Sequence, residues 1–167
     1  MQVWQPKSFM AAVLPAELVE FVESGVSELV GTRDAALRPH AMRGFGVVVR
    51  PDREGITLFL AEKVSQDVLA DLRDNGQIAV TFSRPIDHRS VQLKGKATEV
   101  RPTSSAERLI QERYLAAWVE QLFQVGLPRA LGRRMQIFPS VAVQIEVHEI
   151  FQQTPGPGAG RRMEHGA

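Results

Sequence analysis

The sequence contains no cysteine among its 167 residues. Disulfide bonds, thiol catalysis, zinc ribbons and iron–sulfur clusters are therefore excluded. The chain also lacks a dominant charge, because 20 basic side chains stand against 19 acidic ones. The net charge of +1 gives no overall electrostatic reason to expect nucleic acid or a membrane surface as a partner.

Long apolar runs are absent too. No stretch approaches the roughly 20 residues of a membrane-spanning helix, and the opening residues, MQVWQPKSFM, show no signal-peptide pattern. We therefore expect a soluble, cytoplasmic protein. At about 150 residues per domain the length predicts one domain, which we place at residues 1–153. The Pro/Gly-rich segment 154–167 is expected to form an irregular tail.

Common catalytic motifs are missing as well. The sequence holds no G-x-S-x-G elbow, no P-loop and no G-x-G-x-x-G fingerprint, and the GFG at 44–46 is typical of a β-bulge. Glu146 and His148 share one face of a predicted strand. An exposed strand face explains this pair more simply than a metal site, so no metal is predicted.

Apolar periodicity and turn residues divide the chain into alternating elements. Ser104 and Glu107 have the spacing of a capping box, and Ser65 is a natural N-cap for a shorter helix. The pattern predicts helices at 15–24, 64–76 and 104–123, and strands at 26–32, 37–50, 56–62, 77–83, 89–100 and 140–151.

Strands outnumber helices and follow one another at short spacing. This favours a mostly β fold with peripheral helices (α+β), arranged as a small antiparallel barrel, over a doubly wound parallel sheet. The strands at 56–61 and 77–83 carry apolar or small residues on both faces. Because one barrel interior covers only one face, we expect a second copy of the chain to cover the other, as a homodimer.

Residues 37–100 resemble the pyridoxamine 5'-phosphate oxidase-like family of FMN-binding split barrels. The resemblance rests on an R-P-H strand at Arg38-Pro39-His40 with Arg43 beyond it, and on three later segments. It implies an antiparallel split β-barrel and a homodimer with two flavin sites between the subunits. The three segments are ITLFLA (56–61), VSQDVLADLRDNGQIAVTF (64–82) and RSVQLKGKATEV (89–100).

The resemblance also implies a set of cofactor-binding residues. Arg43 takes the place of an arginine on the flavin phosphate, and Ser65, followed by Gln66, that of the serine opening the short helix. A serine-led helix N-terminus suits a phosphate, because its amide groups and partial positive charge face the ligand. The remaining members of the set are Phe59, Leu60 and Ala61, whose backbone lies against the flavin, Ser90, which reaches toward the ring, and Gln92 on the same strand face.

Two departures from the family pattern bear on function. Asp67 stands where the family usually has a lysine, and its carboxylate would repel a phosphate by about 2–6 kcal/mol, although Lys63 nearby can compensate. The family oxidase's C-terminal substrate motif is not found in TPGPGAGRR. Pyridoxamine phosphate oxidase activity itself is therefore not expected.

The sequence supports two functional hypotheses. The first is a flavoprotein that uses FMN for electron or hydride transfer on an unknown small molecule, with no catalytic acid or base identifiable. The alternative is a non-catalytic ligand-binding split barrel that has lost FMN or binds heme or another cofactor. The arginines at 129, 133 and 134 form either a solvated loop or a phosphate site.

Overall fold

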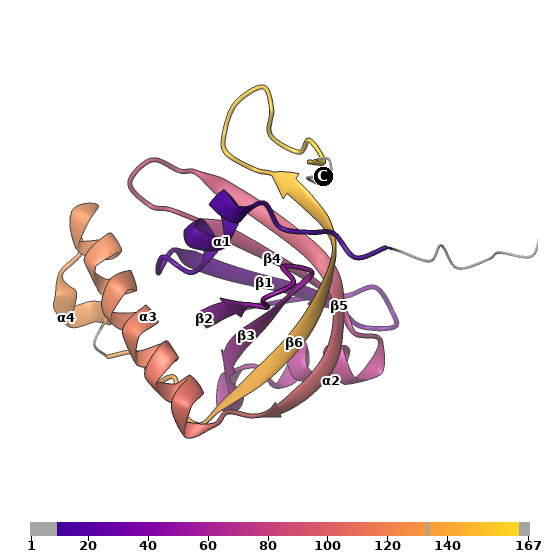
Figure 1. Ribbon diagram of the computed structural model, residues 1–167. Coiled ribbons are helices and arrows are strands. Elements are labelled where there is room, and N and C mark those ends of the chain that lie inside the picture. The colour runs from indigo at the N-terminus through magenta and orange to yellow at the C-terminus, as the bar shows by residue number, and fades with distance from the viewer. Residues whose placement is uncertain (1–9, 133, 164–167) are drawn as a thin grey trace, which may run out of the picture.

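Six strands form a closed antiparallel β-barrel in the computed structural model, which describes residues 10–132 and 134–163. The strand order around the barrel is β1-β2-β3-β6-β5-β4 (Figure 1). This confirms the fold class predicted from the sequence. The strands are β1 (Ser27–Arg33), β2 (Pro39–Val49), β3 (Gly55–Ala61), β4 (Gln77–Ser83), β5 (Ser90–Pro102) and β6 (Ser140–Gln152).

The helices lie outside the barrel or across its end (Figure 1). All three helices expected from the sequence are present, while η1 and α4 were not predicted. No helix within residues 10–132 and 134–163 is long and apolar enough to cross a membrane. The helical elements are α1 (Ala16–Val22), the 3₁₀ turn η1 (Glu62–Val64), α2 (Gln66–Asp74), α3 (Ser105–Gln124) and α4 (Arg129–Gly132).

Alternating side chains of the strands fill the barrel. On β4 the buried residues are Ile78, Val80 and Phe82, as the alternation predicts, and their neighbours Ala79 and Thr81 are only partly covered. Leucines and valines of α2 join the same cluster, so this helix is held against the barrel by its apolar face. Each fully buried aliphatic side chain contributes about 1.5–3 kcal/mol.

Helix α3 covers the outer face of β3. Ala61 belongs to a second apolar cluster with Tyr114 and Trp118 of α3, and Phe59 is fully buried. The apolar outer face of β3 is thus covered within the chain, and it no longer argues for a second copy. Leu109 and Phe123 of this helix face away from the cluster and are 55% and 47% exposed.

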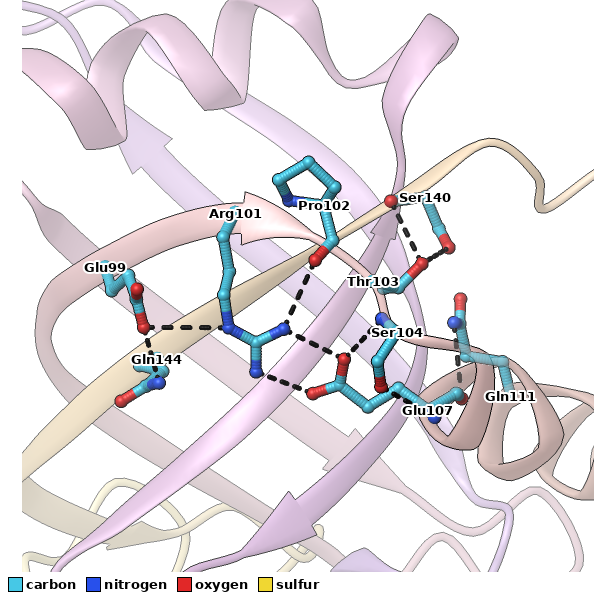
Figure 2. A network of polar contacts seen from close by, with 9 residues as sticks. All are labelled: Glu99, Arg101, Pro102, Thr103, Ser104, Glu107, Gln111, Ser140 and Gln144. Carbon is cyan, nitrogen blue, oxygen red and sulfur yellow. Dashed lines mark hydrogen bonds and ion pairs between the residues drawn. The ribbon is translucent and has the colours of Figure 1, made fainter.

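A polar network fixes the start of α3 where β5 ends (Figure 2). The predicted capping box is confirmed, because Ser104 Oγ accepts from Glu107 N (3.3 Å) and Glu107 Oε2 accepts from Ser104 N (2.8 Å). Arg101 Nη2 donates to Glu107 Oε1 at 2.7 Å. This guanidinium lowers the pKa of Glu107 to about 2, so the network stays charged from neutral pH well into acid.

The segment after β6 turns back over the end of β5 and β6. Thr154 Oγ1 accepts from Ser90 N (3.0 Å), and Met163 N donates to Ile150 O (2.8 Å). Within residues 154–163 the backbone forms turns and one isolated bridge, from Phe151 to Arg162. This part of the segment packs as a strap on the barrel through Met163.

Candidate functional site

A groove of about 740 Å³ lies on the outer face of β1, β4, β5 and β6. Gly31, Ala79 and Lys94 form one row across three neighbouring strands within it, so small residues leave space between longer ones. Pockets of about 300–1,000 Å³ are typical of cofactor sites. The groove is also lined by the charged or titratable side chains Arg33, Lys96, Glu146, His148 and Glu149.

Gln92 lies on the same face of β5 as Lys94, two residues before it, at the edge of this groove. Its amide Nε2 donates to Thr81 Oγ1 at 2.9 Å on the neighbouring strand. Ser90 is buried at the start of the strand, and its hydroxyl is within 2.7 Å of Ser83 Oγ and donates to His88 O at 2.8 Å. Gln92 is therefore the more accessible of these two predicted site residues.

Arg43 lies on β2, beneath helix α3. Its Nη2 donates to Ser27 Oγ at 3.1 Å, and its guanidinium carbon is 4.4 Å from the centre of the Trp118 ring. The other terminal nitrogen, Nη1, is buried and has no hydrogen-bond partner among the described residues. A buried guanidinium nitrogen without an acceptor can still donate a hydrogen bond to an anion.

The predicted backbone contact residues of β3 are fully integrated into the barrel. Leu60 pairs with Gly44 of β2 on one side and with Val141 of β6 on the other. Phe59, Leu60 and Ala61 are each no more than 3% exposed. Their side chains are buried, and the first exposed residues that follow them are Lys63 and Val64 in η1.

Helix α2 begins at Gln66, as predicted, but Ser65 does not cap it. Ser65 occupies the N-cap position, yet its buried Oγ makes no hydrogen bond to any described residue. Gln66 Nε2 turns back to Glu62 O at 2.7 Å. The first turn of α2 thus lacks a side-chain cap and keeps amide groups for an anion. Exposed Lys63 and Asp67 flank it with opposite charges.

The predicted site residues fall on two opposite walls of the barrel. Arg43 and the β3 residues lie on the β2–β3 side, and the start of α2 follows β3 in the chain through η1. Ser90 and Gln92 lie on β5, which β3 and β6 separate from β2 in one direction and β4 and β1 in the other. One chain therefore does not bring the two groups to one ligand.

Glu28 is a buried titratable group that the sequence analysis missed. It is 0% exposed on β1, and its Oε2 accepts from Gly46 N at 3.0 Å. Burial away from water raises its pKa from 4.5 to about 8, although the Gly46 bond and Arg43 oppose the shift. The burial of Glu28 could have been predicted from the sequence, because Glu28 lies on the same strand face as Val26 and Val30, which are both buried.

A second missed group ties α2 to the barrel. Buried Asp71 of α2 accepts from Thr32 Oγ1 at 2.6 Å, and its Oδ2 is 2.8 Å from His40 Nδ1. The hydrogen bond to this carboxylate raises the pKa of His40. Polar contacts with β1 and β2 therefore hold the helix whose first turn borders the candidate phosphate site.

Of the arginines at 129, 133 and 134, Arg129 is engaged in contacts with α3. Arg129 Nε donates to Glu120 Oε1 at 2.7 Å, and its guanidinium lies over the Phe123 ring, 3.5 Å from the ring centre. Arg134 is exposed, and Arg133 lies outside the described residues. No two of these arginines converge on one point in the described structure, so the phosphate site considered for them gains no support.

Comparison with known proteins shows the family to which this chain belongs. The sequence profile of the family described as pyridoxamine 5'-phosphate oxidase matches residues 14–154. The chain belongs to this family. The match spans the whole barrel and both groups of predicted site residues. No curated protein sequence matches the chain.

Several solved structures share the fold of this family member. A candidate pyridoxamine 5'-phosphate oxidase of Lactobacillus delbrueckii has 14% identity and a TM-score of 0.53, covering 83% of this chain and 93% of its own. HupZ of Group A Streptococcus has 18% identity and a TM-score of 0.54, over 88% and 100%. An F420 reductase has 12% identity and a TM-score of 0.55, over 82% and 98%.

Proposed function

We propose that this member of the pyridoxamine 5'-phosphate oxidase family binds a flavin-type cofactor, FMN in the first instance, between two copies of the chain. Electron or hydride transfer to a small molecule would be its activity. The division of the predicted site residues between opposite walls supports the proposal most directly, because a second copy is what would bring Gln92 to the Arg43 side. One similar structure is that of an F420 reductase.

The residues present fit such a group in charge and in space. Arg43, with its unpaired Nη1, and the uncapped first turn of α2 with Lys63 would hold the phosphate. Gln92 of a second copy would donate an amide N–H toward the ring system. A bound flavin would supply the redox chemistry, while the chain binds it, orients it and excludes water from it.

The surface proposed for dimerisation lies on β1 and β4. Leu29 is 55% exposed on the outer face of β1, although a leucine in the middle of a strand usually packs. Gly31, Ala79 and Thr81 continue the same face across the two strands. Small and apolar residues on neighbouring strands suit close packing against a two-fold-related copy.

Light scattering at micromolar concentration should give about twice 18.5 kDa. Leu29→Glu places a charge at the centre of the proposed contact, so we expect mainly monomer and loss of FMN binding together. Leu37→Glu, on the β1–β2 turn where Leu37 is 71% exposed, is the matched control and should leave the mass unchanged. A monomeric wild-type protein would contradict the proposed dimer.

Calorimetric titration with FMN and riboflavin tests the phosphate half of the site. Asp67→Lys should tighten FMN binding because it replaces repulsion with attraction. Arg43→Ala should weaken it by about 1.5–3 kcal/mol, roughly ten- to hundredfold. Riboflavin, which lacks the phosphate, should respond to neither change, and added salt should reduce both FMN effects. If the two substitutions change FMN binding and riboflavin binding equally, the FMN phosphate does not bind at the N-terminal end of α2.

The exposed carboxylate of Asp67 in the first turn of α2 would repel a phosphate. It therefore favours one alternative: a ligand-binding split barrel that has lost FMN or holds heme or another cofactor. The colour of the purified protein separates the two functions. Flavin absorbance, present on purification or after FMN is added, supports the flavoprotein. A Soret band supports heme, and a colourless protein that ignores FMN supports loss of the cofactor.

A further inference from the structure

Two buried polar atoms of complementary character lack partners where β1, β2 and α3 meet. Oε1 of Glu28 and Nη1 of Arg43 are both buried, and neither makes a hydrogen bond to any described residue. A buried polar atom without a partner is costly, and such atoms are rare in folded proteins. The pair therefore needs a physical explanation.

The two side chains lie beside the same short stretch of backbone. A Cβ atom added at Gly44, the residue after Arg43, would lie 2.5 Å from Glu28 Oε2, so the carboxyl rests against this glycine. Arg43 Nη2 in turn donates to Ser27, the residue before Glu28. The positive charge of Arg43 consequently acts on Glu28 and partly offsets the effect of burial on its pKa.

The other surroundings of Glu28 are apolar or keep a constant charge. Glu28 pairs with Phe82 of β4, and Leu58 of β3 packs against Gly44. Helix α3 packs over β2 (Figure 1) and contributes Tyr114, which is in electrostatic contact with Glu28. Burial raises the pKa of Tyr114 well above its ordinary value, so this phenol stays protonated. Glu28 is therefore the member of this group that changes its charge near neutral pH.

We propose that Glu28 is a positioning residue for the candidate phosphate site: its neutral carboxyl leaves Arg43 free to bind a phosphate, and its ionised carboxylate takes the guanidinium for itself. This role of Glu28 rests on the proposed function, since it requires Arg43 to be a ligand of the phosphate. A carboxylate forms a charge-assisted bond with a guanidinium and competes with any other anion, whereas a neutral carboxyl does not. Burial raises the pKa of Glu28 to about 8, so the neutral form is the one present at pH 7.

A purely structural role accounts for less of what is seen. The bond from Gly46 N to Glu28 Oε2 holds the bulge of β2, but it uses only one of the two carboxyl oxygens. A glutamine could accept the same bond without a buried acidic group. An acid at this position has a consequence only for a neighbour that responds to its charge, and Arg43 is that neighbour.

Calorimetric titration with FMN between pH 7 and pH 9.5 tests the proposal, because the second ionisation of a phosphate lies below this range. The affinity of the wild type for FMN should fall about tenfold across the range as Glu28 ionises. Glu28→Gln should lose this fall and bind FMN about tenfold more tightly than the wild type at pH 9.5. Riboflavin should show no such fall. His40 is present in both proteins, so its raised pKa affects both profiles equally.

Proton uptake measures the same coupling independently. Because FMN selects the neutral form of Glu28, its binding at pH 8.5 should take up about half a proton or more, measured in buffers of different ionisation enthalpy. Glu28→Gln should lose this uptake. Glu23→Gln is the matched control, since Glu23 Oε1 also accepts from a backbone amide of β2, that of Val49 at 2.7 Å, but is exposed. It should behave as the wild type does in both measurements.

Tryptophan fluorescence follows the pair without any cofactor. The Arg43 guanidinium lies over the Trp118 ring, 4.4 Å from its centre. Withdrawal of the guanidinium should change the emission of Trp118 with a midpoint near pH 8 in the wild type, and Glu28→Gln should lack this transition. The chain has two tryptophans, so Trp118→Phe identifies the source of the change.

The measurements separate failure of this proposal from failure of the proposed function. A fall in FMN affinity that Glu28→Gln retains, or that riboflavin shows equally, would overturn the role of Glu28. If no flavin binds at any pH, the proposed function fails, and the emission of Trp118 decides the role of Glu28. A transition that Glu28→Gln removes supports control of Arg43 by Glu28, and a wild type without a transition contradicts it.

Discussion

Glu28→Gln should stabilise the protein by about 5 kcal/mol at alkaline pH and leave its stability almost unchanged below pH 4.5. The carboxyl of Glu28 has a raised pKa in the folded chain because it is buried. Unfolding therefore releases its proton at any pH between 4.5 and about 8, and each pH unit in that window costs the folded wild type about 1.4 kcal/mol. Glutamine has nearly the same shape, can accept from Gly46 N and carries no charge.

Urea unfolding across a pH series measures this effect. The wild type should lose stability as pH rises through the window, and the Glu28→Gln curve should be flatter. The raised pKa of His40 acts in the same direction, so some slope above pH 6.5 should remain in the variant. Glu112→Gln, an exposed carboxyl on α3, serves as the control. Parallel curves for wild type and Glu28→Gln would show that Glu28 is already ionised at neutral pH.

Gly95→Ala should destabilise the barrel by about 3 kcal/mol or more, or prevent folding. A Cβ atom at this position would lie 1.9 Å from the backbone oxygen of Glu146 on the neighbouring strand. Backbone atoms held in a sheet cannot move aside as a flexible side chain can. Gly95 also lies at a register shift between β5 and β6, so a displaced strand would disturb the longest strand pair of the barrel.

Gly158→Ala is the comparison for this substitution. Gly158 lies in the segment that folds back after β6, outside the surface proposed for dimerisation, and a methyl group there would meet no atom within 4 Å. Alanine should therefore be neutral or slightly stabilising at position 158, since it restricts the unfolded chain. Thermal unfolding of both variants measures the contrast. Similar melting temperatures would mean that β5 and β6 can separate locally without loss of the fold.

The order of the elements could be predicted from the sequence because each element carries a local signal. Alternation of Ile78, Val80 and Phe82 indicated β4, and the capping box at Ser104 and Glu107 located the start of α3. The bulge predicted at the GFG segment is present as a register shift between Gly44 and Val47. Signals of this kind depend on a few neighbouring residues, so they can be recognised without knowledge of the tertiary structure.

Local sequence patterns could not predict how elements far apart in the chain pack on one another. Both faces of β3 read as buried, but only the structure shows that α3 of the same chain covers the outer one. Helix α3 leaves the apolar Leu109 and Phe123 exposed and buries the polar Gln111, because the sheet beneath the helix determines which of its faces is covered. Ser65 occupies the cap position without bonding, and its backbone (φ −108°, ψ 17°) departs from the extended conformation of a typical capping residue.

The place of β6 between β3 and β5 has a consequence for synthesis of the chain on the ribosome. Residues 55–61 pair with residues 140–146, so the barrel closes only after nearly all of the chain has left the exit tunnel. Until then β3 and β5 each present one unpaired edge, and unpaired edges invite association with other chains. Slow translation at any point before β6 has left the tunnel should prolong that exposure and increase aggregation of nascent chains.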